Sequence, residues 1–197
     1  MGLLDKVSSW LGNRPRVTAP VLVLGLDRAG KTSLLHALRP PDPTAQGAQQ
    51  GAPQGVAPQM EHFQSGGVAF SAWDVSGAAR ARALWERHYR RAHALIFVVD
   101  AADHLRLVVA REELELVLAH PDMSARRVPL LVLANKSDVP GALPPDQLAG
   151  ALGLARVVDR PWHVAAASAR SGAGLADGIA WLARQVRDMH TPPKIQH

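Results

Sequence analysis

The sequence predicts an α/β fold in which a mostly parallel, six-stranded sheet carries helices on both faces. Continuous apolar runs alternate with helical stretches along a chain of 197 residues, a length that suits one domain. Hydrophobic residues make up 47% of the chain, enough for a real core. There is no cysteine, and no apolar run approaches the ~20 residues of a membrane-spanning helix. We therefore expect a cytoplasmic protein without disulfides.

The chain is predicted to begin with a short amphipathic helix. One face of residues 2–11 (GLLDKVSSWL) gathers the apolar side chains Leu3, Leu4, Val7, Trp10 and Leu11. Such a helix can lie weakly and reversibly on an anionic membrane, or pack in a groove on its own domain. Gly2 invites acylation, but Lys6 stands where that motif needs Ser or Thr. We divide the chain into this helix and linker (1–15), a globular domain (16–190) and a tail (191–197).

The remaining elements follow from the apolar runs and the helix breakers. Strands are expected at 21–25, on both sides of a Gly66-Gly67 turn within 60–74, and at 94–100, 128–136 and 162–168. Helices are expected from Lys31 to the prolines at 40–41, over 103–119, and at about 144–153 and 174–189. Residues 41–59 hold few bulky apolar side chains and read as a loop.

Residues 25–32, GLDRAGKT, fit the phosphate-binding pattern G-x-x-x-x-G-K-[ST] between a strand and a helix. That context argues against a chance glycine-rich turn. The glycines let successive N–H groups point inward, and the helix N-terminus adds partial positive charge. Lys31 is expected to reach the β- and γ-phosphates, and the Thr32 hydroxyl to bind Mg²⁺. The predicted phosphate-binding residues are Gly25, Leu26, Asp27, Arg28, Ala29, Gly30, Lys31, Thr32 and Ser33.

A second motif, Asn135-Lys136-Ser137-Asp138, follows a buried strand and predicts that the base of the bound nucleotide is guanine. The Asp138 carboxylate can accept N1–H and the exocyclic amine of guanine, a pair that adenine does not offer. The stems of Asn135 and Lys136 would order the loop. The same four residues would also suit an exposed turn, but their place after the phosphate loop favours the base-binding interpretation.

With Asp74-Val-Ser-Gly77 (D-x-x-G) between these motifs, the chain resembles the small GTPases. GLDRAGKT and the amphipathic helix before the first strand are typical of the Arf and Arf-like branch, and the resemblance spans roughly residues 1 to 189. It implies the P-loop small-GTPase fold with GTP or GDP and Mg²⁺ as ligands. It further implies that Asp74 holds Mg²⁺ through water, that the Gly77 amide senses the γ-phosphate, and that the Ala166 N–H meets guanine O6.

Two departures from the family pattern concern hydrolysis. Ala78 stands where the family carries the glutamine that orients the attacking water, and a methyl group cannot orient water. In the 41–59 loop, Gln54 or Gly55 stands where the family carries a threonine that binds Mg²⁺. Thr44 is the only hydroxyl-bearing residue of this loop, and it lies well upstream of that position. We therefore expect weak hydrolysis. A slow GTPase switch and a non-hydrolysing GTP-binding scaffold both stay open, whereas the second motif disfavours a P-loop kinase or ATPase.

The resemblance also implies partners. The branch that the chain resembles most implies recruitment of the BBSome coat to ciliary membranes, at the ciliary base or beyond. Neither an exchange factor nor an activating protein can be named. We expect a monomer that does not bind nucleic acid, although the net charge is +5 and five arginines follow D-x-x-G: Arg80, Arg82, Arg87, Arg90 and Arg91. The nearby aromatic residues Trp73, Trp85 and Tyr89 fit either interface anchors or ordinary core packing.

Overall fold

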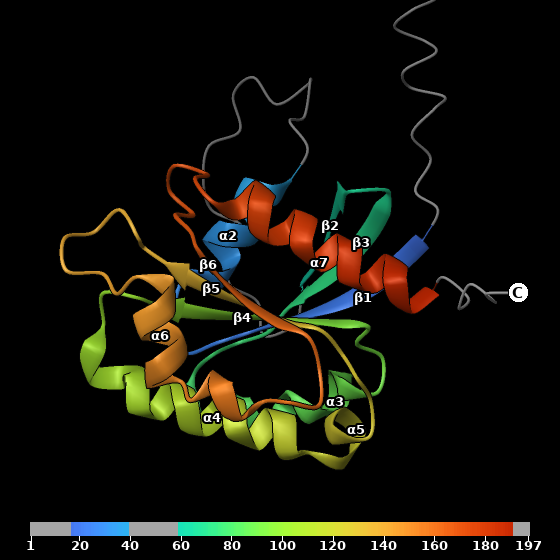
Figure 1. Ribbon diagram of the computed structural model, residues 1–197, viewed down its shortest axis with the longest axis horizontal. Helices are drawn as coiled ribbons and strands as arrows, with labels where there is room; N and C mark the ends of the chain where they lie inside the picture. Colours follow the sequence, from blue (N-terminus) through green and yellow to red (C-terminus); the bar gives the residue numbers. More distant parts are fainter. Residues whose placement is uncertain (1–16, 40–58, 191–197) are drawn as a thin grey trace, which may run out of the picture.

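The computed structural model describes residues 17–39 and 59–190, which form a six-stranded sheet between two helical layers (Figure 1). The strands are β1 (Val17–Leu24), β2 (Gln59–Ser65), β3 (Val68–Asp74), β4 (Ala94–Asp100), β5 (Leu130–Asn135) and β6 (Trp162–Ala166). Their order in the sheet is β2-β3-β1-β4-β5-β6, and only the β2–β3 pair is antiparallel. The predicted mostly parallel sheet and the hairpin around Gly66-Gly67 are confirmed.

Helices lie on both faces of the sheet, as predicted. The α-helices are α2 (Lys31–Leu38), α3 (Glu86–Tyr89), α4 (Leu107–Ala119), α5 (Pro121–Ser124), α6 (Pro145–Ala151) and α7 (Leu175–His190). Three 3₁₀ turns join them: η1 (Ala79–Leu84), η2 (His104–Arg106) and η3 (Leu154–Arg156). Helices α2 and α7 cover one face, and α3 to α6 cover the other (Figure 1). The helix predicted over 103–119 is η2 continuing into α4.

Strand β4 shows why the central strands read as unbroken apolar runs. Leu95 and Phe97 belong to the core under α4 and α6, whereas Ile96 and Val98 belong to the core under α2 and α7. All four side chains are fully buried. A strand that is covered on both faces has no polar alternation, so periodicity alone could not tell which side chain faces which layer.

Strand β1 begins at Val17, four residues earlier than predicted, because Pro20 does not interrupt it. A proline lacks the N–H that a central strand normally uses. Here pairing with β4 starts only at Val21, opposite Ala94, and the Pro20 carbonyl accepts the His93 N–H at 2.8 Å. The missing donor therefore falls just outside the β1–β4 ladder.

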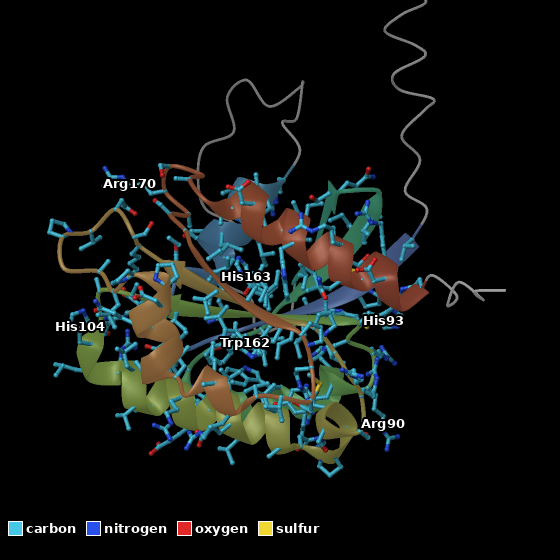
Figure 2. The ribbon with its side chains drawn as sticks, viewed as in Figure 1. Arg90, His93, His104, Trp162, His163 and Arg170 are labelled. Carbon is cyan, nitrogen blue, oxygen red and sulfur yellow. The ribbon has the colours of Figure 1, made fainter. Side chains whose placement is uncertain are left out.

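The carboxyl ends of the parallel strands gather at one edge of the sheet, where α/β proteins bind ligands. His104 and Arg170 lie toward this edge, and Arg90 and His93 toward the opposite one (Figure 2). The predicted amphipathic helix, the 41–59 loop with Thr44, Gln54 and Gly55, and the tail lie outside the described residues. The division into 1–15, 16–190 and 191–197 therefore stays a prediction.

Candidate functional site

The phosphate loop joins β1 to α2 and holds its lysine folded over its own backbone. Lys31 Nζ donates to the carbonyl oxygens of Gly25 at 3.0 Å and Leu26 at 2.9 Å. The side chain is only 7% exposed, and this burial lowers the pKa of Lys31 to about 8, against the opposing pull of Asp74 and Asp27. Gly30 begins the helix at φ 94°, where a Cβ would collide with the Asn135 amide.

The D-x-x-G segment rests directly on this loop. Asp27 N–H donates to the Gly77 carbonyl at 3.1 Å, and a Cβ on Gly77 would overlap the backbone of residues 25–27. Arg82 secures the contact, because its Nε donates to the same Gly77 carbonyl at 3.0 Å and its Nη1 bonds Glu113 Oε1 at 2.7 Å. The segment is thus tied to both the phosphate loop and helix α4.

Thr32 and Asp74, predicted as metal-binding residues, come together from α2 and β3. The Thr32 hydroxyl donates to Asp74 Oδ2 at 2.6 Å, so one cation could be reached from both side chains. Mg²⁺ is commonly held by one or two protein oxygens together with phosphate and water, and this donor set fits that pattern. Within residues 17–39 and 59–190, no group of three or more His, Asp or Glu could hold a metal by itself.

Asn135 is buried and joins three segments of the site. Its Nδ2 donates to the Ala29 carbonyl at 2.7 Å, and its Oδ1 accepts the Ala169 N–H at 2.9 Å. Asn135 is 1% exposed; its bond to Ala29 is buried and its bond to Ala169 is partly buried. It holds the phosphate loop against the loop that follows β6.

Asp138 and Lys136, the other two predicted base-binding residues, are fixed differently. Asp138 is exposed, and a hydrogen bond from the Ser168 side chain, with smaller help from its backbone and Arg170, lowers the pKa of the carboxyl. It is therefore ionised and accepts only, as a guanine partner must. Lys136 stands at φ 63°, and its Nζ donates to Asp100 Oδ2 at 2.5 Å.

Ala166, whose N–H is expected to meet guanine O6, is the last residue of a strand. It lies within β6, in register with Ala134, so it belongs to the sheet. The residues after β6 meet the second motif: the Ala167 carbonyl accepts the Ser137 N–H at 3.0 Å, the Ala169 N–H donates to Asn135, and the Ser168 side chain bonds Asp138. Arg170 lies on the same loop (Figure 2). The contact between the Ala166 N–H and guanine O6 stays a prediction, and the loop directly after β6 lies beside the second motif.

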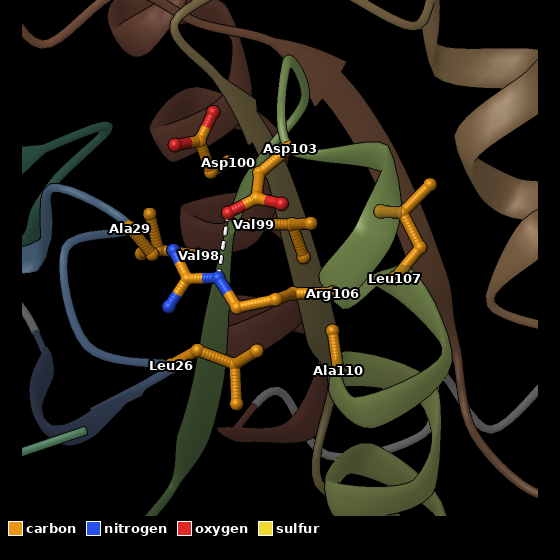
Figure 3. A pocket seen from close by; sticks show the side chains of 9 residues that line it. All are labelled: Leu26, Ala29, Val98, Val99, Asp100, Asp103, Arg106, Leu107 and Ala110. Atoms are coloured by element: carbon orange, nitrogen blue, oxygen red, sulfur yellow. Dashed lines mark hydrogen bonds and ion pairs between the residues drawn. The ribbon is translucent and has the colours of Figure 1, made fainter. Parts of the chain in front are cut away.

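A small cavity of about 10 Å³ lies behind the phosphate loop, between the end of β4 and the start of α4 (Figure 3). It is close to the space of one water molecule. Arg106 crosses it: Nε donates to Asp103 Oδ2 at 2.6 Å, and Nη1 reaches the carbonyl oxygen and Oδ1 of Asp27 at 3.1 and 3.2 Å. Arg106 thus joins the phosphate loop to the start of helix α4, and the cavity around it has a structural role.

Ala78 follows Gly77 at the start of η1, with its N–H donated to Ser76 Oγ at 3.3 Å. Its methyl group offers no hydrogen bond to water. Two of the neighbouring aromatic residues are core: Trp85 is 1% exposed and donates Nε1–H to the Ser76 carbonyl at 2.9 Å, and Tyr89 is 5% exposed. Trp73 is partly buried against the same core, 5.6 Å from the His88 ring.

Comparison with known proteins agrees with this geometry. The model of the ADP-ribosylation factor family matches residues 5–186. The chain is 42% identical over 195 residues to ADP-ribosylation factor-like protein 6 of Danio rerio, covering 97% of this chain and all of the relative. It is 38% identical to ADP-ribosylation factor-like protein 3 of Chlamydomonas reinhardtii over 187 residues, 95% of this chain and all of that protein.

A solved structure is similar as well. It is the Arl6 (BBS3) small GTPase of Trypanosoma brucei with the bound nucleotide analogue GppNp. The TM-score is 0.76 at 34% sequence identity, and the match covers 87% of this chain and 98% of that one.

The fold and the arranged motifs define a P-loop protein of the small-GTPase class. Within that class, the chain belongs to the ADP-ribosylation factor family. Family members bind GTP and GDP. No helix in the described part of the chain is both long and apolar enough to cross a membrane.

Proposed function

We propose that the protein is a guanine-nucleotide-dependent switch that binds GTP and GDP with Mg²⁺ and hydrolyses GTP very slowly. The observation that carries the proposal is the joining of the two motifs by Asn135, which bonds both Ala29 and Ala169. Asn135 thereby holds the phosphate loop and the base-binding motif next to each other. In this proposal Asp138 selects guanine, and the backbone N–H that meets O6 comes from Ala166 or from the loop Ser168-Ala169-Arg170 after β6.

Lys31 and the amides of Gly25 to Ser33 hold the phosphates in this proposal. Thr32 binds Mg²⁺ directly and Asp74 holds it through water, and the ion when bound neutralises charge that develops on the phosphates. The Gly77 segment, resting on the loop beside Asp27, is placed to respond to a γ-phosphate. Nothing at Ala78 orients the attacking water.

The same Ala78 favours a second candidate, a GTP-binding scaffold that does not hydrolyse at all. The two candidates share the binding site and differ only in turnover. A related small GTPase that has its glutamine already hydrolyses GTP at only ~10⁻⁴ per second, so loss of that group should make the hydrolysis rate negligible.

The binding proposal is tested by displacement of a fluorescent GDP analogue from the purified full chain. GTP and GDP should displace it, and ATP at the same concentration should not. Displacement by ATP would contradict the assignment of Asp138 and restore the kinase or ATPase alternative.

For the partner we propose GTP-dependent recruitment of the BBSome to ciliary membranes, with the N-terminal residues Leu3, Leu4, Val7, Trp10 and Leu11 in peripheral contact with lipid. The support is similarity to ADP-ribosylation factor-like protein 6. Purified BBSome should sediment with anionic vesicles when the full chain is loaded with a GTP analogue and stay in solution when it is loaded with GDP. Equal sedimentation with both nucleotides would contradict the proposal.

A further inference from the structure

Arg28 occupies an unusual place in the middle of the phosphate loop. Among the described residues, only Arg28 (φ 61°) and Lys136 (φ 63°) are non-glycine residues in the left-handed backbone region. Glycine takes that region freely and asparagine at low cost, whereas a long cationic side chain gains nothing from it locally. Both cations therefore sit in strained backbone at the two motifs of the nucleotide site.

The two cations differ in what holds them. Lys136 Nζ bonds Asp100 Oδ2, so its charge is compensated. Arg28 is exposed, and no hydrogen bond or ion pair joins its guanidinium to any residue of 17–39 or 59–190. The neighbouring carboxylates are already engaged: Asp27 bonds Arg106 at 3.2 Å, and Asp74 accepts the Thr32 hydroxyl.

We propose that the Arg28 guanidinium is an additional ligand of the nucleotide's phosphates, which slows release of bound GDP and GTP. The inference rests on the proposed function. A phosphate chain held by the loop amides lies against the backbone on both sides of Arg28, well within the reach of its side chain. The planar guanidinium offers paired N–H donors that match phosphate oxygens, and such charge-assisted bonds are stronger than neutral ones.

Arg28 would act alongside Lys31 and not in its place. Lys31 is buried and folded onto the Gly25 and Leu26 carbonyls, whereas Arg28 lies at the exposed rim of the loop. A rim cation stays partly in water, so its contribution should be screened by salt, unlike that of the buried lysine. Salt dependence of nucleotide release is therefore the signature of this residue.

The test is the release rate of a fluorescent GDP analogue from the full chain, chased with excess GDP at low and high sodium chloride. Arg28→Asn tolerates the left-handed backbone and removes the charge, and Arg28→Lys keeps the charge. Arg127→Asn is the matched control, since Arg127 is exposed and follows α5 at the far edge of the sheet. Thermal unfolding without nucleotide checks that each variant folds.

Arg28→Asn should release the analogue about tenfold faster at low salt, with the difference shrinking at high salt. The release rate of Arg28→Lys should lie between those of Arg28→Asn and the natural protein. The release rate of Arg127→Asn should equal that of the natural protein. Release from Arg28→Asn at the natural rate overturns the inference and leaves the proposed function standing, as does equal acceleration by Arg127→Asn. A natural protein that binds no guanine nucleotide overturns both.

Discussion

The Asn135 side chain donates to the Ala29 carbonyl at 2.7 Å while its oxygen accepts the Ala169 N–H at 2.9 Å. One buried amide thus joins the phosphate loop to the loop that follows β6. The Asn135 side chain and the Ala29 carbonyl are buried, so the amide should be costly to remove.

Asn135→Ala should lower the free energy of unfolding by about 2 kcal/mol, because it leaves the buried Ala29 carbonyl and the partly buried Ala169 N–H unpaired. GDP affinity should fall as well, since the two loops lose their common anchor. Denaturant unfolding and nucleotide titration measure the two effects. Gln64→Ala, an exposed amide on β2, is the control and should change neither. An Asn135→Ala variant as stable as the Gln64→Ala variant would contradict this role.

Asp138→Asn should change the preferred base from guanine to xanthine. The amide can accept only one guanine N–H and presents its own NH₂ to the guanine amine, so GDP affinity should fall roughly a hundredfold. Xanthosine diphosphate carries a carbonyl at that position and should bind better than GDP. Affinities of both nucleotides for Asp138→Asn and for the exposed-site control Asp146→Asn decide the point. Unchanged GDP affinity would place the base elsewhere.

Nucleotide affinity should weaken as the pH rises through the Lys31 pKa. Burial lowers this pKa to about 8 in the free protein, and bound phosphate favours the charged form, which raises it in the complex. Binding therefore takes up a proton above pH 8, so the affinity is full at pH 7 and declines at higher pH. Between pH 7 and 8.5 the loss should be roughly fourfold, measured by titration with GDP. A flat profile would show that Lys31 does not meet the phosphates.

Arg82→Ala should loosen the Gly77 segment from the phosphate loop. It removes the bond to the Gly77 carbonyl and the partly buried pair with Glu113, which together contribute about 1–2 kcal/mol of stability. GTP affinity should fall more than GDP affinity, because only GTP carries the phosphate that the segment is placed to meet. Arg80→Ala, in the same 3₁₀ turn and exposed, is the matched control. Equal losses for GTP and GDP would contradict the assigned role.

The central sheet could be predicted because the residues that define each of its strands are adjacent in the sequence. Runs such as 94–100 and 130–135 are apolar throughout, and the glycines and the lysine of the phosphate loop identify the turn that follows β1. Residues 79–89, in contrast, form a 3₁₀ turn and one short helix. No regular period marks a buried face there, so Trp85 and Tyr89 could be recognised as core only from the structure.

The end of β6 shows the other limit. Residues 164–169 read Val-Ala-Ala-Ala-Ser-Ala, and small side chains do not reveal where the strand ends. The end of β6 is set by pairing with Ala134 on the neighbouring strand, which is a tertiary contact. The predicted strand therefore ran to residue 168, whereas β6 ends at Ala166.

The central claim, a guanine-nucleotide switch with its water-orienting group missing, is tested most directly by single-turnover hydrolysis of pre-bound GTP with Mg²⁺. The natural protein and Ala78→Gln are compared under the same conditions. We expect the natural protein to hold GTP intact for many hours and the glutamine to speed turnover at least tenfold. Hydrolysis by the natural protein near ~10⁻⁴ per second, unchanged in Ala78→Gln, would show that another group orients the water and would contradict the account.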